Sequence, residues 1–227
     1  MNKIFWYLLL TLSLASCIEI HDEISLKNDG SGTFSYKINL NSSKLKVNSI
    51  LALDSLDGKK VPSINEIKDK INKYKELFAK KEGISNVKTE TNFNEFILKF
   101  QCDFTSVLAL QKAVKEVFEE ESKSKTLRDI ETNWLVWENN KLIRSIPSVT
   151  QDFTSKLKRE DLEALKNGKY FSISRFEKPI EKFDNPLSIV SPNKLNILVK
   201  NSTYSLIKNL KLLENTIYLS DSKKQEK

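Results

Sequence analysis

The sequence predicts an α+β fold in which antiparallel β-hairpins alternate with amphipathic helices that cover one face of the sheet. Paired runs of alternating apolar and polar residues, separated by turn-forming residues, predict strands with one buried face. Between these pairs, apolar residues recur every three or four positions, as in helices with one buried stripe. Of the 227 residues, 39% are hydrophobic, which is enough to build a core and argues against disorder throughout.

The chain opens with a segment that has the features of a secretion signal. Lys3 supplies a positive charge, and residues 4–14 are mostly apolar and carry no charge. This run is shorter than the roughly 20 residues that a membrane-spanning helix needs. Two small residues and a cysteine then complete the sequence Leu14–Ala15–Ser16–Cys17. We therefore expect residues 1–16 to be a signal peptide.

This motif resembles the lipobox of bacterial lipoproteins, in which a leucine and two small residues precede a cysteine. The resemblance implies that the thiol of Cys17 receives a diacylglyceryl group, that cleavage falls before Cys17, and that its amino group is then acylated. Two or three acyl chains anchor a protein stably, since each buried methylene contributes about 0.8 kcal/mol. An ordinary secretion signal is the alternative, but it does not need a cysteine after the cleavage site. The membrane is thus the expected partner.

The residue after the cysteine bears on location. It is Ile18 and not an aspartate. In bacteria with two membranes, this resembles lipoproteins that are sorted to the outer membrane. We expect a lipid-anchored protein of the cell envelope, at the periplasmic face of the outer membrane.

The first predicted hairpin spans residues 18–40. Its break is Asn28–Asp29–Gly30–Ser31–Gly32, where glycine accommodates positive φ and Asn and Asp form local hydrogen bonds. The only histidine, His21, is expected on the polar face near Asp22 and Glu23, as an exposed strand residue. The apolar residues that alternate along the two strands are Ile18, Ile20, Ile24, Leu26, Phe34, Tyr36, Ile38 and Leu40.

Residues 17–40 resemble a group of poorly characterised bacterial lipoproteins. These proteins open with a lipidated cysteine, a strand, an Asp-Gly-Ser-Gly turn and a second strand, as this chain does from Cys17 to Leu40. The resemblance implies a membrane-attached α+β domain with no established activity.

The next elements are a short helix over residues 43–57 and a longer helix that begins after Ser63. Ser63 and Glu66 have the spacing of a capping box, and Gly83 is expected to end the helix. One apolar stripe predicts that this helix packs on the sheet; it consists of Ile64, Ile67, Ile71, Tyr74 and Phe78.

A second hairpin is predicted over residues 84–104, with its turn at Asn92–Phe93–Asn94, followed by a helix over residues 105–122. A third hairpin, over residues 127–147, turns at Asn139–Asn140. Trp134 and Trp137 are three positions apart on its first strand, so they are expected to face opposite ways. One of them would then be exposed and could mark a partner surface.

The last third continues the same pattern. A helix over residues 152–167 ends at Gly168 and precedes a strand over residues 170–176. The segment from Lys178 to Pro186 is predicted to be a loop and is the best candidate for a domain boundary. The domain therefore spans residues 17–177, with residues 178–221 as part of it or as a small subdomain, and 222–227 as a polar tail. Within 178–221 we expect strands at 187–190, 195–200 and 216–220 and a helix near 202–213.

No catalytic group or metal-ligand set stands out. A zinc site needs three or four ligands, and the chain has one histidine. Cys102 lies in a strongly alternating strand, where a small buried hydrophobe is expected. The net charge of +7 comes from lysines that alternate with acids, so we expect no nucleic acid partner. Because no metal-ligand set or phosphate-binding loop is found, we also expect no cofactor.

These observations predict a non-catalytic binding or structural protein whose partner is an envelope protein, lipid or polymer. The alternative is an envelope hydrolase that uses carboxylates without a recognisable motif.

Overall fold

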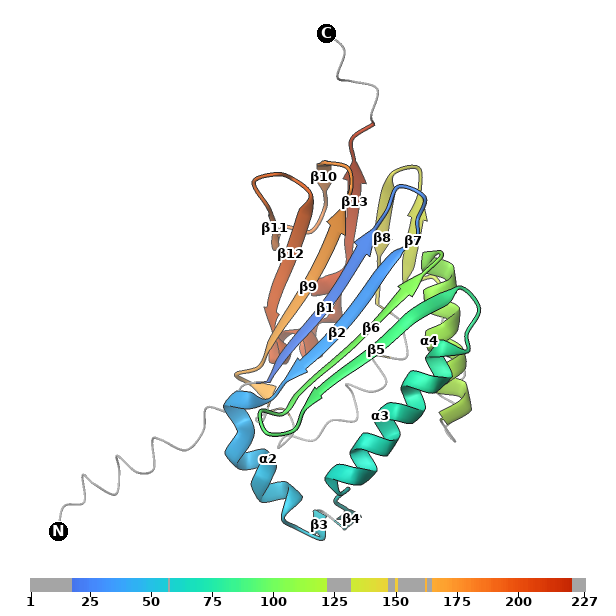
Figure 1. Ribbon diagram of the computed structural model, residues 1–227. Helices are drawn as coiled ribbons and strands as arrows, with labels where there is room; N and C mark the ends of the chain where they lie inside the picture. Colours follow the sequence, from blue (N-terminus) through green and yellow to red (C-terminus); the bar gives the residue numbers. More distant parts are fainter. Residues whose placement is uncertain are drawn as a thin grey trace, which may run out of the picture.

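Two β-sheets pack face to face in the computed structural model, which describes residues 18–56, 58–121, 132–146, 150, 162 and 165–221 (Figure 1). The larger sheet has seven strands, in the spatial order β11 (Ser188–Val190), β12 (Asn196–Ser202), β9 (Lys169–Phe176), β1 (Glu19–Leu26), β2 (Gly32–Asn39), β6 (Ile97–Phe104) and β5 (Ile84–Asn92). The smaller has four, in the order β10 (Ile180–Phe183), β13 (Asn215–Leu219), β8 (Lys141–Arg144) and β7 (Leu135–Glu138).

Among the described strands, neighbours are antiparallel with one exception. β1 and β9 run parallel, with Ile20 opposite Tyr170 and Ile24 opposite Ser174. A parallel pair needs a long connection, and here the chain between β1 and β9 supplies all of β2 to β8. The mixed α+β class is confirmed, and the large sheet is mostly antiparallel.

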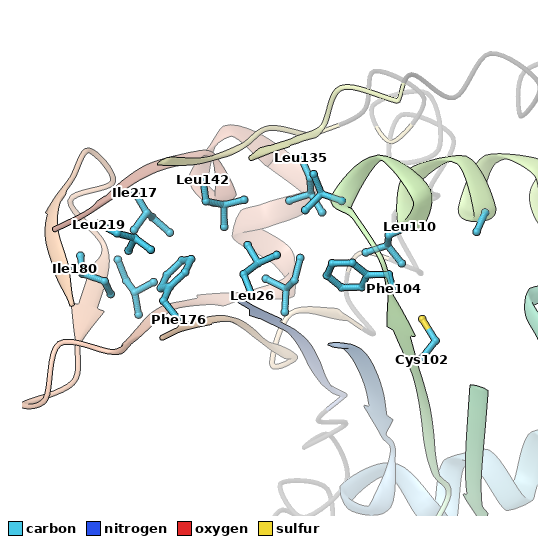
Figure 2. Packing of buried hydrophobic residues seen from close by; sticks show 14 of the residues in the cluster. Leu26, Cys102, Phe104, Leu110, Leu135, Leu142, Phe176, Ile180, Ile217 and Leu219 are labelled. Atoms are coloured by element: carbon cyan, nitrogen blue, oxygen red, sulfur yellow. The ribbon is translucent and has the colours of Figure 1, made fainter. Parts of the chain in front are cut away.

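The core lies between the two sheets (Figure 2). Leu26 and Phe176 of the large sheet face Leu142 and Ile217 of the small sheet, and Leu110 closes one end of this layer. Ile24, Leu110 and Leu142 are at most 1% exposed. The predicted alternation therefore identified the buried face correctly, but much of its cover is a second sheet, which the sequence analysis did not predict.

The helices also lie on the inner side of the large sheet. Within the described residues they are α2 (Lys44–Leu51), α3 (Ile64–Ala79), α4 (Val107–Glu121) and α7 (Thr203–Lys208), with the 3₁₀ turns η1 (Asn41–Ser43) and η3 (Leu210–Leu213). Phe78 of α3 packs against Phe100 of β6 with ring centroids 4.9 Å apart. The buried amide of Gln111 in α4 donates to the Leu135 carbonyl and accepts from the Leu135 N–H, both at 2.9 Å. α4 is thus hydrogen-bonded to the edge of the small sheet.

Several elements match the sequence-based expectations. The three hairpins form, and the capping box of Ser63 and Glu66 is present at the start of α3. Asn139 and Asn140 both have positive φ, as a two-residue hairpin turn of type I′ requires. Gly30 has a φ of +82° in the first turn.

Other boundaries differ. The helix expected over residues 43–57 ends at Leu51, because the chain then forms the small hairpin β3 (Ser55–Leu56) and β4 (Lys59–Lys60). The expected loop at 178–186 contains β10, since its backbone pairs with β13. The helix near 202–213 is divided at Asn209, whose extended backbone separates α7 from η3.

The strands after residue 178 belong to both sheets: β11 and β12 extend the large sheet, and β10 and β13 lie in the small one.

Some predictions concern residues outside the described part of the chain: the signal peptide 1–16, Cys17, most of the helix at 152–167, and the tail 222–227. Among the described residues, no helix has the length and apolar character needed to cross a membrane.

Candidate functional site

A buried ion pair joins the two sheets. Asp22 projects inward from β1 and Arg144 projects from β8, and they are 7% and 8% exposed. The Arg144 guanidinium donates from Nη2 to Oδ2 of Asp22. Because strand residues alternate between faces, Asp22 lies on the opposite face from His21 and Glu23, with which the sequence analysis had grouped it.

Strand β9 completes the polar cluster. The Tyr170 hydroxyl donates to Oδ2 of Asp22 at 2.7 Å, and Arg144 Nη1 donates to the Ser172 hydroxyl at 2.6 Å. Asp22 and Ser172 are register partners in the parallel β1–β9 pair. The parallel pairing thus places the groups that hold Asp22 and Arg144 in position.

Burial and the Asp22 charge shape the protonation states of this cluster. Burial, with a smaller contribution from Asp22, raises the pKa of Tyr36 to about 12. Burial and then Asp22 also raise the pKa of Tyr170. Burial lowers the pKa of Arg144, but the nearby Asp22 and Tyr170 more than offset this, so its pKa is raised overall. At neutral pH both tyrosines are therefore hydroxyl donors and Arg144 is charged.

This cluster borders a cavity of about 360 Å³. Apolar side chains supply most of the wall, among them Ile20, Trp134, Leu206 and Leu213. The polar part of the wall includes Asp22, Tyr36, Arg144 and Tyr170. A mostly apolar hollow with a few convergent polar groups is typical of a small-molecule site.

Two buried donors in the wall lack acceptors. Among the described residues, Arg144 Nε and Trp134 Nε1 have no hydrogen-bond partner. Asn201 Nδ2, on the strand position opposite Tyr170, also has none. A buried donor without an acceptor costs about 1–3 kcal/mol. Asn201 does not line the cavity, but Arg144 and Trp134 do. Acceptor oxygens of a bound molecule would satisfy these two donors.

A larger hollow of about 630 Å³ also has Arg144 in its wall. Several of its other polar groups are hydrogen-bonded within the protein. Asn185 donates to the carbonyls of Leu212 and Glu214 at 3.0 and 2.7 Å, and Asp184 accepts from the Thr216 N–H at 2.7 Å. These bonds fix the loop before β11, and we do not assign a ligand to this hollow.

The sequence matches no known protein-family model and no curated protein. Among solved structures, the chain is similar to the folded domain of the Mycobacterium tuberculosis protein LppM, determined by NMR. The TM-score is 0.39 and the sequence identity is 10%, and the match covers 91% of this chain and 93% of that chain. A likeness of this degree carries no functional implication.

Of the residues that the sequence analysis selected, Leu14, Ala15, Ser16 and Cys17 lie outside the described part of the chain. His21 lies on the outer face of the large sheet, where it stacks on Phe171 with ring centroids 4.6 Å apart. Burial, and then Lys37, lower its pKa. Cys102 is fully buried, as predicted, and burial raises its pKa to about 12. The described residues contain no cluster of side chains suited to a metal ion.

The two tryptophans differ from the expectation that one is exposed. Both are half-buried and both pack against the main core. Trp137 shares the inner face of β7 with Leu135 and stacks on Phe176, with centroids 6.3 Å apart. Trp134 precedes β7 and lines the cavity. The chain turns just before the strand, so a spacing rule for strands does not apply to Trp134.

Asp22, Arg144 and Tyr170 are not among the functional residues predicted from the sequence. One signal was available: Asp22 lies between Ile20 and Ile24 in the alternating pattern, on the face that the alternation predicts to be buried. A carboxylate at such a position needs a partner. The partner is Arg144, which is 122 residues from Asp22 along the chain. It reaches Asp22 only through the packing of the two sheets, so the sequence does not identify it.

Proposed function

We propose that this protein is a lipid-anchored component of the bacterial cell envelope, attached through Cys17 at the periplasmic face of the outer membrane. The sequence Leu14–Ala15–Ser16–Cys17 after an apolar leader supports the attachment, and Ile18 supports the outer membrane. β1 begins at Glu19, two residues after the cysteine. The folded domain would then be held close to the bilayer.

The role of the domain is non-catalytic binding of an amphipathic small molecule in the Asp22–Arg144 cavity. The observation that carries this proposal is the pair of buried donors without acceptors, Arg144 Nε and Trp134 Nε1. The apolar wall would enclose an aliphatic or ring body, and the donors would bind acceptor oxygens at its polar end.

An envelope hydrolase is the alternative proposal. Hydrolysis of a glycosidic bond by carboxylates uses two of them. Asp22 is the only acid among the described residues that line the cavity, and Arg144 and Tyr170 both donate to its Oδ2. A carboxylate held in this way supports a binding role more than a role in proton transfer.

The attachment is tested with a clickable fatty acid fed to cells that express the full chain. We expect labelling of the wild type and loss of the label in Cys17→Ser, and inhibition of signal cleavage by globomycin. An unlabelled wild type with a normal amount of protein would refute the attachment.

The cavity is tested with decanoate, which combines an aliphatic chain with one acceptor-bearing group. Trp134→Phe removes one unpaired donor and keeps an aromatic ring, and should weaken decanoate binding by about fivefold, the effect of one hydrogen bond. Trp137→Phe is the matched control, because Trp137 stacks on Phe176 and does not line the cavity. Equal weakening in both variants, or no binding to the wild type, would count against this site.

A further inference from the structure

A second apolar hollow lies at one end of the large sheet. It has a volume of about 200 Å³ and lies between α2, α3 and the ends of β2 and β6. We call it the α2–α3 groove. It shares no lining residue with the Asp22–Arg144 cavity, although Ile20 of the cavity is the register partner of Ile38 in the groove. Its wall is mostly aliphatic and aromatic and includes Ile38, Leu40, Val47, Leu51, Ile71 and Phe96.

The helices that form the groove leave much apolar surface uncovered. Neither α2 nor α3 contains a buried residue, although α3 carries a complete apolar stripe. Three leucines around α2 and β3 are exposed: Leu45 is 86% exposed, Leu53 46% and Leu56 44%. Exposed apolar surface next to an apolar groove marks a binding surface for an apolar partner. We call α2, β3, β4 and the first turn of α3 the tip of the domain.

The tip lies at the end of the domain where the chain enters the fold. Glu19 pairs with Asn39, so Ile18 lies at the level of Leu40, which lines the groove. Cys17 is the residue before Ile18, and consecutive Cα atoms are about 3.8 Å apart. Figure 1 shows α2 at the same end as the start of β1, whereas β13 ends at the other end of the molecule.

The charges of the tip suit an anionic membrane surface. Lys46 and Lys59 are exposed beside the leucines and form no ion pair within the described residues. Over residues 44–67 the sequence has four lysines and three acids, Asp54, Asp57 and Glu66, so the tip carries a surplus of one positive charge. Two further lysines are paired with acids, Lys44 with Glu95 at 3.1 Å and Lys60 with Glu66 at 2.5 Å. Exposed leucines flanked by free lysines are typical of segments that lie in the bilayer interface.

We propose that the tip docks on the bilayer and that the α2–α3 groove takes up an acyl chain of a membrane phospholipid. The exposed leucines enter the interface, and Lys46 and Lys59 lie among the headgroup phosphates. The orientation rests on the proposed attachment at Cys17, which brings this end of the domain to the membrane.

The test is photo-cross-linking in vesicles. The full chain, purified from membranes with its N-terminus as the cell leaves it, is reconstituted in vesicles of phosphatidylethanolamine and phosphatidylglycerol. A phospholipid with a diazirine in its acyl chain is the probe. After irradiation and digestion, we expect adducts on peptides that carry residues 44–51, 64–79 and 93–98, and none on peptides that carry residues 188–199.

Two variants separate the groove from general contact with the membrane. Ile71→Trp fills the groove, and loss of the adducts is expected. Leu45→Glu changes a side chain that is 86% exposed, so folding is retained while entry of α2 into the interface is opposed, and the α2 adducts should be lost. Ile189→Glu, at an exposed apolar residue of β11, is the matched control and should label like the wild type.

Adducts that are absent from the groove peptides, or unchanged in Leu45→Glu, overturn the proposal. In a second experiment, a diazirine fatty acid is attached to Cys17 by metabolic labelling. If the groove is cross-linked by this Cys17-bound acyl chain and not by the phospholipid probe, the protein's own lipid occupies the groove, which also overturns the proposal. Acylation of Cys17 is read from the same digest. A chain found to be unacylated, with or without its leader, is added to the same vesicles from solution, so failure of the attachment does not hide the result for the groove.

Discussion

The Arg144 guanidinium of β8 donates to the Asp22 carboxylate of β1, so one ion pair connects the small sheet to the large sheet across the core. Each residue is less than 10% exposed. A buried pair of this kind adds little net stability, but breaking it leaves an uncompensated charge in the core. The pair therefore fixes how the two sheets sit against each other and shapes the wall of the cavity.

Removing one partner should be more harmful than removing both. Arg144→Met should lower the free energy of unfolding by about 3–5 kcal/mol, because Asp22 stays buried without its cation. The double variant Asp22→Leu, Arg144→Met should recover much of this loss, since it replaces the pair with apolar side chains. Urea denaturation measures both. A double variant less stable than Arg144→Met would show that the pair contributes net stability.

Gly32 in the first hairpin is required for a close backbone approach. A Cβ at this position would lie 1.9 Å from the Ser25 carbonyl oxygen, which is backbone and cannot move aside. We expect Gly32→Ala to destabilise the protein by about 1–3 kcal/mol, as overpacking does. Gly58→Ala is the comparison, because a Cβ there meets no atom within 4 Å, although φ is +74°. Thermal unfolding should show the larger loss for Gly32→Ala, and equal losses would contradict the steric explanation.

The capping box of α3 should make stability depend on acid. The hydrogen bond from Lys60, and then those from Ser63, lower the pKa of Glu66 from 4.5 to about 2. A carboxylate with a lowered pKa in the folded state stabilises the fold above its unfolded pKa, and this contribution is lost as the pH falls. The stability gap between the wild type and Glu66→Gln should thus be full above pH 4.5 and vanish near pH 2. Glu76→Gln, on the same helix outside the capping box, should show no such change.

Cys102 should be inert in the folded protein. The thiol is fully buried, and burial, followed by Asp103, raises its pKa to about 12. Because the thiolate is the reactive form, a maleimide should modify Cys102 only as fast as the protein unfolds. Mass spectrometry across a urea series measures this rate. Rapid modification in the absence of urea would contradict the described packing of β6.

The sequence predicted local structure well because its signals are local. The capping box of Ser63 and Glu66, the Asn139–Asn140 turn and the alternation of β1 all appear in adjacent residues. The second sheet could not be predicted in this way, because β10 and β13 pair across a long separation and β10 has a polar surface. The cavity depends on the same long-range packing: Asp22, Arg144 and Tyr170 come together only when both sheets are formed.

The central claim, attachment of the domain to a membrane through Cys17, is tested most directly by the mass of the N-terminal peptide of the mature protein. We predict a peptide that begins at Cys17 and carries a diacylglyceryl group, with or without a further acyl chain on its amine. A peptide that begins at any other residue, or one in which Cys17 has a free thiol, would contradict the account.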